Sequence, residues 1–396
     1  IKWGQGKMEM GTEFFEKVHV PEAILNPFQE VTMKDKVGFI GLGLIGGSIA
    51  KAIRQYHPTY EIVAFDKNKE TLALATQESV IDVAATTIDD NFRNCSYIFL
   101  CAPVSYNTAY LKQVAKYLGK GCILTDVGSV KTNIHNEVAA LGLGSHFIGG
   151  HPMAGSEKSG YPNSKAMLIE NAYFVLTPCA ETKQENLDRY AAFVQQLGAI
   201  PVILEAHQHD YITGTISHLP HIIAASLVNF VRDNDTKEEL MKNLAAGGFK
   251  DITRIASSSP TMWQHICVKN KENISQILAN YIETLQQAKA LVDQGDEQGL
   301  YQLFDTSRNY RNSLPSTSAG PIKKTFAVYC DIIDEAGGIA TIATILASNN
   351  LNIKNIGIVH NREFEEGVLR IEFYDENSSN KAALLLQKYR YIVYER

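Results

Sequence analysis

The sequence predicts three units: an α/β unit with a mostly parallel sheet, an all-helical unit, and a small βαββαβ unit. Three observations support this division. Apolar strand-like runs alternate with helical patterns from residue 33 to residue 205. Residues 206–311 then carry long helix-period stretches with almost no strand signal. A stretch rich in Ser, Pro and Gly at residues 312–322 is typical of a linker, and residues 323–396 follow it.

The first unit follows residues 1–32, which show no clear period and to which we assign no function. Helical patterns such as Leu44–Tyr56 and Leu187–Leu197 lie between strand-like runs, which favours helices on both faces of a sheet. The predicted strands are Val37–Gly41, Glu61–Asp66, Tyr97–Ala102, Cys122–Asp126, Phe147–Gly149, Tyr173–Thr177 and Pro201–Leu204.

The two later units differ in their periodicity. Long helical patterns such as His209–Arg232 and Asn273–Gln294 predict an all-helical second unit. In the third unit two helical patterns alternate with strands in the order βαββαβ, the split βαβ arrangement of a ferredoxin-like fold. Its predicted strands are Thr325–Ile332, Ile353–His360, Gly367–Tyr374 and Tyr391–Tyr394, and its predicted helices are Gly338–Asn349 and Asn380–Lys388.

Composition narrows the class of protein. The chain has 396 residues, of which 45% are hydrophobic and 20% charged, so it can bury a substantial core. Its net charge of −6 does not favour nucleic-acid binding. We find no run of about 18 apolar residues and no secretory signal, and therefore expect no membrane span. The six cysteines form no CxxC pair, so we expect free thiols in a reducing cytoplasm.

A glycine-rich turn predicts a cofactor site. Gly41, Gly43 and Gly46 form a GxGxxG directly after a predicted strand and before a predicted helix, and Asp66 ends the next strand twenty residues beyond Gly46. The first glycine permits a tight turn, the second lets backbone approach a pyrophosphate, and the third lets helix and strand pack closely. The pyrophosphate would then lie on free N–H groups at the helix N-terminus. This pattern predicts a Rossmann-type dinucleotide-binding domain.

Asp66 decides which dinucleotide we expect. Its carboxylate can accept hydrogen bonds from the ribose hydroxyls and would repel a 2′-phosphate, which favours NAD over NADP. Lys67 and Lys69 argue in the opposite direction, because cations there could accommodate that phosphate.

Three polar loops follow neighbouring strands of the first unit. They are Ala102-Pro103-Val104, Asp126–Ser129 and His151–Gly155. Ligands of a doubly wound sheet bind beyond the carboxyl ends of its strands, so we place the reaction centre at these loops. Ala102 and Pro103 are expected to contact the cofactor.

His151 is the candidate base. A neutral imidazole at this strand end could accept a hydroxyl proton while a hydride leaves the same carbon. Ser129, on a neighbouring loop, could bond the same hydroxyl, or it could simply be the N-cap of the helix that follows.

The second unit offers two further polar stretches. In Ser217–His221 two histidines lie three residues apart on one helix face. His207 and His209 are near in sequence, but no carboxylate or cysteine stands at a confirming spacing, so we predict no metal. Farther along, Arg254 could fork onto a substrate carboxylate with Asp251 orienting it, or the two could form a surface ion pair.

Taken together, these motifs resemble the prephenate dehydrogenase family from about Lys36 to Arg311. The resemblance rests on five motifs in order: GLGLIGGS at Gly41–Ser48, TDVGSVK at Thr125–Lys131, GGHPMAGSEKSG at Gly149–Gly160, SHLPH at Ser217–His221 and AAGGFKDITRIASSSPTMW at Ala245–Trp263.

The resemblance implies oxidative decarboxylation of prephenate to 4-hydroxyphenylpyruvate in tyrosine biosynthesis, with NAD as oxidant. By analogy, His151 takes the hydrogen bond of the ring hydroxyl and Ser129 assists it. Helical domains of this family form the dimer. The implied substrate-pocket residues are Ser217 and His221 in its lining, Arg254 on a carboxylate, Asp251 beside it, and Glu157 at its mouth.

Residues 323–396 resemble an ACT domain, a ligand-sensing module of amino-acid metabolism. In such domains a glycine in the first strand–helix turn lets backbone approach an amino acid, and helix N–H groups can meet its carboxylate. Asn352 and Asn355 could add contacts from a paired domain, or the unit could only add dimer contacts. We expect L-tyrosine as the effector, and the turn residues implied are Asp334, Gly337 and Gly338.

Three other functions remain open from the sequence. Arogenate dehydrogenase is the nearest, since arogenate carries an amino group where prephenate has a keto group. A β-hydroxyacid dehydrogenase would use a helical-domain lysine, for which Lys250 is the candidate, but the His151 motif and the ACT-like unit argue against it. A non-catalytic amino-acid sensor is disfavoured by the presence of His151, Ser129 and Arg254.

Overall fold

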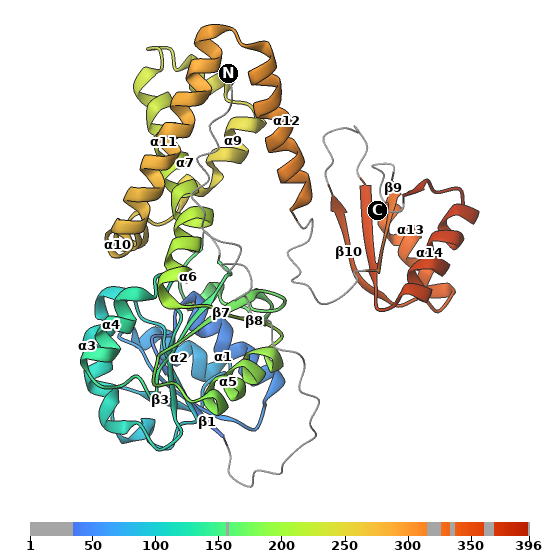
Figure 1. Ribbon diagram of the computed structural model, residues 1–396. Helices are drawn as coiled ribbons and strands as arrows, with labels where there is room; N and C mark the ends of the chain where they lie inside the picture. Colours follow the sequence, from blue (N-terminus) through green and yellow to red (C-terminus); the bar gives the residue numbers. More distant parts are fainter. Residues whose placement is uncertain (1–34, 156–157, 315–325, 333–336, 360–367, 395–396) are drawn as a thin grey trace. The chain divides into compact units, whose positions relative to one another are not determined.

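The computed structural model describes residues 35–155, 158–314, 326–332, 337–359 and 368–394. The chain divides into two compact units, Ile1–Gly320 and Pro321–Arg396 (Figure 1). The larger unit contains the α/β and helical parts, and the smaller contains the C-terminal part. The N-terminal extension at residues 1–32 lies outside the described residues.

A five-stranded parallel sheet forms the centre of the α/β part, with strand order β3-β2-β1-β4-β5. The predicted parallel sheet is therefore confirmed. Strand β3 was not predicted, because its three apolar residues are fewer than the four to eight that mark a strand in a sequence. The strands are β1 (Lys36–Ile40), β2 (Glu61–Phe65), β3 (Val83–Ala85), β4 (Tyr97–Leu100) and β5 (Ile123–Asp126).

Three further strands continue this sheet: β6 (Ile148–Pro152), β7 (Tyr173–Pro178) and β8 (Ile200–Ile203). A parallel bridge between Leu124 and Phe147 links β5 to the start of β6. Strand β7 runs antiparallel to β6 and parallel to β8. A helical crossover is needed only between parallel neighbours, and the described residues between β6 and β7 form two 3₁₀ turns at Tyr161–Asn163 and Ala166–Leu168.

Helices cover both faces of the sheet, as predicted. One buried cluster joins Phe39 of β1 to side chains such as Ile53 and Val194, and the other joins Ile40 to Leu111 and Val138. Consecutive β1 residues therefore face opposite layers, as the period of two requires. The helices are α1 (Leu44–Tyr56), α2 (Lys69–Gln77), α3 (Val104–Val114), α4 (Thr132–Ala140) and α5 (Gln184–Gln196).

The second part is helical throughout, which confirms the predicted class. Its first helices, α6 (Ala206–Thr213) and α7 (Leu219–Asn234), are joined without a break by a π-helical turn at Gly214–His218. Such single π turns often occur at functional sites. The remaining helices are α8 (Leu240–Leu244), α9 (Gly247–Thr253), α10 (Pro260–Lys269), α11 (Lys271–Gln294) and α12 (Glu297–Ser313). Helix α12 thus continues to the second residue of the predicted linker.

By length and composition, one helix of the described chain could cross a membrane: the continuous stretch Ala206–Asn234, of whose most apolar window 17% is buried. The sequence-based search for about 18 consecutive apolar residues did not register this helix, because polar and charged residues interrupt its apolar runs. The same helix carries the buried polar groups His209, Asp210 and His218.

The C-terminal unit is an antiparallel sheet with two helices, in the predicted order βαββαβ. Its strand order is β10-β11-β9-β12, the ferredoxin-like arrangement expected for an ACT domain. Its core includes Cys330, Ile342, Leu369 and Leu386. The elements are β9 (Phe326–Asp331), α13 (Gly338–Ser348), β10 (Ile353–Val359), β11 (Val368–Phe373), α14 (Glu376–Lys388) and β12 (Val393–Tyr394).

Candidate active site

The glycine turn between β1 and α1 is shaped by close backbone approach. Gly41 has φ +94°, and a Cβ there would lie 2.7 Å from the backbone nitrogen of Ala102. A Cβ on Gly46 would lie 2.7 Å from the carbonyl oxygen of Gly41 and 2.9 Å from Cβ of Cys101. Gly43 differs, since no atom lies within 4 Å of its would-be Cβ. The turn is therefore packed on its protein side and open at Gly43.

Asp66 adjoins this turn from the end of β2. Its carboxylate accepts hydrogen bonds from the backbone N–H groups of Leu42 (2.7 Å) and Asn68 (2.8 Å). Lys67 places its ammonium 4.0 Å from the ring centre of Tyr106, in a cation–π contact. Ala102 and Pro103 follow β4, and Pro103 is the N-cap of α3.

These features fit a dinucleotide. The N-terminus of α1 offers free N–H groups for a pyrophosphate, and the open space at Gly43 leaves room for its approach. Each Asp66 oxygen accepts one backbone hydrogen bond and retains lone pairs for ribose hydroxyls.

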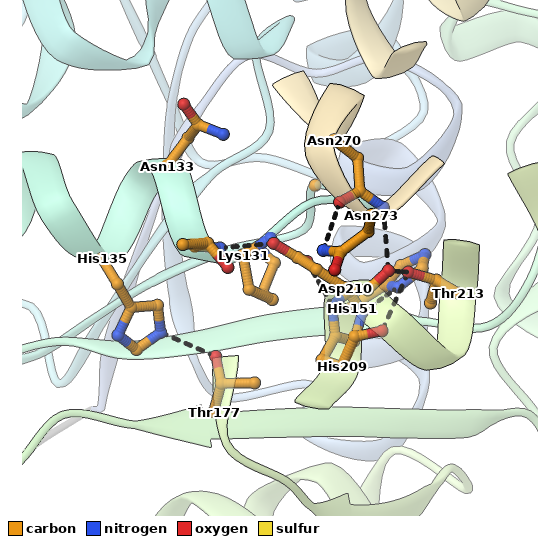
Figure 2. Close-up of polar contacts among 12 residues, drawn as sticks. Lys131, Asn133, His135, His151, Thr177, His209, Asp210, Thr213, Asn270 and Asn273 are labelled. Atoms are coloured by element: carbon orange, nitrogen blue, oxygen red, sulfur yellow. Dashed lines mark hydrogen bonds and ion pairs between the residues drawn. The ribbon is translucent and has the colours of Figure 1, made fainter. Parts of the chain in front are cut away.

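A chain of polar contacts begins at His151 in β6 and ends at α4 (Figure 2). Nδ1 of His151 lies 2.8 Å from Nε2 of His209, and Nδ1 of His209 lies 2.8 Å from Oδ1 of Asp210. The Asp210 carboxylate accepts the backbone N–H groups of Lys131 (2.7 Å) and Thr132 (2.8 Å). His209 and Asp210, at the start of the helical part, are buried. This series of polar contacts therefore connects the helical part to the end of the parallel sheet.

A buried ion pair supports the strand end beside His151. Lys131 is fully buried, and its ammonium contacts the carboxylate of Asp126 and donates to the carbonyl oxygen of Gly150 at 2.8 Å. Burial lowers the pKa of Lys131, and the charge of Asp126 opposes that shift.

The electrostatics keep His151 neutral. Burial lowers its pKa well below the usual range, and His209, Lys131 and His218 lower it further. Burial also lowers the pKa of His209, against the hydrogen bond from that ring to Asp210. For Asp210, burial raises the pKa, but its hydrogen bonds from His209, Thr132 and Lys131 outweigh burial and the net shift is downward. Asp210 is thus ionised and both imidazoles are neutral near pH 7.

The structure excludes the N-cap role considered for Ser129. Helix α4 begins at Thr132, its N-cap residue is Lys131, and no side chain from that segment caps it. Asp210 takes the capping role instead, from a residue 78 positions away in sequence from Thr132. Ser129 is half-buried in the loop between β5 and α4.

The SHLPH motif lies at the π turn and the start of α7. His221 donates from Nδ1 to the carbonyl oxygen of Ser217 at 2.9 Å and stacks on Trp263 with ring centres 3.7 Å apart. Burial lowers the pKa of His221, and the nearby cation of Arg254 lowers it further. A cavity of about 490 Å³ is lined by His221, Trp263 and both apolar and polar residues of α7, of α10 and of the turn before α10, with Asn229 and Gln264 among the polar ones. Arg254 and Asp251, at and before the end of α9, are exposed.

Two histidines that sequence analysis treated only as possible metal ligands or spacing partners belong to this polar network. His209 was set aside, and Asp210 beside it was not considered. His218 is buried and accepts a hydrogen bond at Nδ1 from the amide of Asn270, which also donates to the carbonyl oxygen of Asp210. The sequence feature that could have indicated these roles was the adjacent His–Asp pair at the start of a long apolar helix. Over the described residues, no group of three or more His, Cys, Asp or Glu side chains could hold a metal ion.

Several expected site residues lie outside the residues that the structure describes or next to a gap in them. Glu157 and Asp334 lie outside the described residues. In the C-terminal unit Gly337, with φ +95°, is the N-cap of α13, and Gly338 is that helix's first residue. Asn352 immediately precedes β10 and Asn355 lies within it, and both are exposed.

Two family models match the larger unit. Residues 49–203 match "Prephenate dehydrogenase, nucleotide-binding domain", and residues 205–306 match "Prephenate dehydrogenase, dimerization domain". The boundary between the two matches falls just before α6.

Individual relatives agree with these matches. The prephenate dehydrogenase of Bacillus subtilis is 37% identical over 352 residues, which is 88% of this chain and 95% of the relative. The prephenate dehydrogenase of Aquifex aeolicus, solved with hydroxyphenyl propionate and NAD⁺, is 31% identical with a TM-score of 0.68, and the match covers 72% of this chain and all of that one. The arogenate dehydrogenase of Synechocystis is 29% identical with a TM-score of 0.64, over 71% of this chain and all of that one.

Proposed function

The chain belongs to the prephenate dehydrogenase family, and on that premise we propose that it catalyses the NAD-dependent oxidative decarboxylation of prephenate to 4-hydroxyphenylpyruvate. The observation that carries the proposal is the neutral, half-buried His151 at the end of β6, backed by His209 and Asp210. Oxidation of a hydroxyl requires a proton acceptor, and a neutral imidazole can fill that role.

NAD is the cofactor of this enzyme. When bound, it supplies the oxidant that accepts a hydride from the substrate carbon. Gly41, Gly43 and Gly46 form the turn that would hold its pyrophosphate, and Asp66 would hold the adenine ribose. Ala102 and Pro103, at the end of β4 beside that turn, complete the proposed cofactor contacts.

His151 accepts the proton of the ring hydroxyl as the hydride leaves the same carbon, and the C–O bond becomes a ketone. This ketone is conjugated to the ring carbon that bears the carboxylate. When that carboxylate leaves as CO₂, the electron pair of the broken C–C bond enters the ring. The oxygen regains a proton from His151, and the ring becomes an aromatic phenol. Ser129, from the loop after β5, assists as a second hydrogen-bonding partner of the hydroxyl.

The remaining substrate contacts come from the helical part. We propose that Ser217 and His221 line the pocket and that Arg254 binds a substrate carboxylate, with Asp251 supporting it. The proximity of Arg254 to His221 supports this assignment, since the arginine lowers the pKa of that histidine. We also propose, from the family resemblance, that Glu157 lies at the mouth of the pocket.

Arogenate is the second candidate substrate. The likeness to the Synechocystis arogenate dehydrogenase favours it as an alternative. The two substrates differ only in an amino or a keto group on the side chain, remote from the carbon that is oxidised. Their chemistry at His151 is therefore the same.

One assay tests the reaction. Purified full-length protein is mixed with NAD and either prephenate or arogenate, and NADH is followed at 340 nm. We expect kcat/KM to be higher with prephenate. A higher value with arogenate would reassign the substrate, and no NADH with either would contradict the proposed function.

We further propose that the functional unit is a homodimer assembled through the helical part. Large apolar side chains of this part face outward, among them Phe230, Leu244, Phe304 and Tyr310, each at least 65% exposed. Large apolar side chains exposed in such number on one part of a protein support the proposal of an interface there. A molar mass by light scattering near twice 43.8 kDa is expected, whereas a monomer would contradict the proposal.

We also propose feedback inhibition by L-tyrosine at the C-terminal unit. Gly337 has φ +95° and no atom within 4 Å of a would-be Cβ, so backbone at the start of α13 is accessible to a ligand. L-Tyrosine must bind one state of the enzyme better than another to inhibit it. Asn352 and Asn355 are proposed as further contacts.

This regulation is tested by comparing inhibition of the full chain, a chain ended near Ser318, and full-length Asn355→Ala. We expect the shorter chain to retain turnover and to lose much of its inhibition, and Asn355→Ala to weaken inhibition. Equal inhibition constants in all three would place tyrosine at the catalytic pocket instead.

The proposed compartment is the cytoplasm. All six cysteines are free, and burial raises the pKa of Cys95 and Cys122 to about 12, so these thiols are inert. Free buried thiols suit a reducing compartment.

A further inference from the structure

We infer that His209, backed by Asp210, is a positioning residue that holds His151 in the tautomer whose Nε2 carries no proton. The inference rests on the proposed function, because it assumes that His151 is the base. It concerns a residue that does not contact the substrate and acts only through His151.

The Asp210 carboxylate fixes the first proton position. Oδ1 of Asp210 accepts the N–H of Lys131, and Oδ2 accepts the N–H of Thr132. Backbone amides can only donate, so both contacts require acceptors and the carboxylate stays ionised. Nδ1 of His209 lies 2.8 Å from the same Oδ1 and must therefore be the ring nitrogen that carries the proton.

The remaining assignments follow from this one. A neutral imidazole has one N–H, so Nε2 of His209 presents a lone pair. Nδ1 of His151, 2.8 Å away, must donate to that lone pair. The single proton of neutral His151 is then on Nδ1, and Nε2 has its lone pair available for a substrate hydroxyl. The opposite assignment would place the lone pair of His209 Nδ1 against an ionised carboxylate.

The protein restrains each member of this chain. His209 is fully buried, and its carbonyl oxygen accepts the hydroxyl of Thr213 at 2.9 Å. The amide of Asn270 donates to the carbonyl oxygen of Asp210 at 2.8 Å, and Asn273 donates to Asn270 (Figure 2). The rings of His151 and His209 meet edge to face at 74°. The acceptor for His151 is therefore preorganised before substrate binds, as an effective positioning group requires.

Two substitutions at one position separate positioning from packing. Leucine at position 209 fills similar space but offers no acceptor to His151, whereas the side-chain carbonyl of glutamine can accept and its amide can donate to Asp210. His207→Gln is the matched control, since His207 lies on the same helix, two residues away, and is exposed. All variants are made in the full chain.

For His209→Leu we expect kcat to fall roughly 10- to 1,000-fold, a part of the 10²–10⁴ that a general base supplies. KM for prephenate and the Kd for NAD should change little. His209→Gln should recover most of the lost kcat, and His207→Gln should match the unmutated enzyme. An unchanged kcat in His209→Leu would overturn the inference. The inference would also be overturned if kcat of His209→Gln were no higher than that of His209→Leu and both KM and NAD affinity were impaired. That pattern would indicate that His209 has only a packing role.

A spectroscopic measurement keeps this inference separate from the proposed reaction. In ¹⁵N-histidine-labelled protein near pH 8, the His151 signals are assigned by their loss in His151→Asn. Proton on Nδ1 is expected in the unmutated protein, with a mixture of tautomers in His209→Leu. Proton on Nε2 in the unmutated protein would overturn the inference even if turnover of prephenate were normal. Absence of turnover with this tautomer in place would instead contradict the proposed function.

Discussion

The two halves of the proposed active site are built in different ways. The cofactor half is formed by backbone: a turn between β1 and α1 in which Gly41 and Gly46 allow close approach and Gly43 leaves open space. The proton-accepting half is formed by side chains that come from both parts of the larger unit and are linked by buried hydrogen bonds. The cofactor half depends on the absence of side chains at its glycines. The proton-accepting half depends on which nitrogen and oxygen atoms carry protons. Substitutions in each half should therefore affect different measured quantities.

His151→Asn tests the proton-accepting half and should have the largest effect. It removes the proposed general base, so kcat should fall roughly 10²–10⁴-fold while the Kd for NAD is kept. In the unmutated enzyme the pKa of His151 is lowered, so its basic form persists to lower pH than for an ordinary histidine. The kcat/KM profile should therefore fall only below about pH 6.5, the usual histidine value. Near-normal turnover in the variant would remove His151 from the mechanism, and His207→Asn serves as the control.

Arg254→Ala tests the substrate contacts of the helical part. Loss of a charge-paired contact to a carboxylate should cost about 2–5 kcal/mol. KM for prephenate should rise accordingly, by a factor of roughly 30 or more, with little change in the Kd for NAD. Arg93→Ala, an exposed arginine of the α/β part, is the control. A rise in NAD Kd with an unchanged KM would place Arg254 in the other half of the site.

Gly43→Ala tests the cofactor half without disturbing the protein around it. Because no atom lies within 4 Å of the added Cβ, the melting temperature should be unchanged. The methyl group would occupy space that the pyrophosphate needs, and such overpacking costs about 1–3 kcal/mol. Calorimetry should show a weaker Kd for NAD. Gly119→Ala, where the surrounding space is also open, should leave the Kd unchanged, and equal affinities in both variants would contradict the assigned pyrophosphate position.

Asp66→Ala should have the smallest effect, on selectivity. Removing the charge that repels a 2′-phosphate should reduce the ratio of kcat/KM for NAD over NADP by about tenfold, equivalent to roughly 1.4 kcal/mol. Asp66→Asn retains an acceptor for ribose and separates charge from hydrogen bonding. Equal use of NADP by the unmutated enzyme would contradict the role given to Asp66.

The same contrast explains what sequence could predict. The glycine turn and Asp66 were predictable because their residue types and spacing follow from local geometry, and the predicted helix Leu44–Tyr56 agrees with α1 in both bounds. The roles of Asp210 and His209 were not predictable in this way. Asp210 caps a helix whose first residue is 78 positions earlier in the chain, and no local period or spacing encodes that contact.

The mixed direction of the last strands was missed for a related reason. Apolar runs predict that strands exist, but their direction depends on the connection between them. The described part of the β6–β7 connection forms short 3₁₀ turns, so β7 runs opposite to β6. The order of the C-terminal unit was predictable because β9, α13 and β11 each form an apolar run of ordinary length, although the last strand spans only Val393–Tyr394.

Because Asp210 both caps α4 and orients His209, proton acceptance by His151 depends on the docking of the helical domain on the sheet domain. The carboxylate that satisfies the N-terminus of a sheet-domain helix is also the one that orients His209, and it belongs to the helical domain. If the two domains separated, α4 would lose its cap and His151 its acceptor in the same event. An undocked molecule could therefore still hold NAD on its glycine turn but could not remove a proton from substrate.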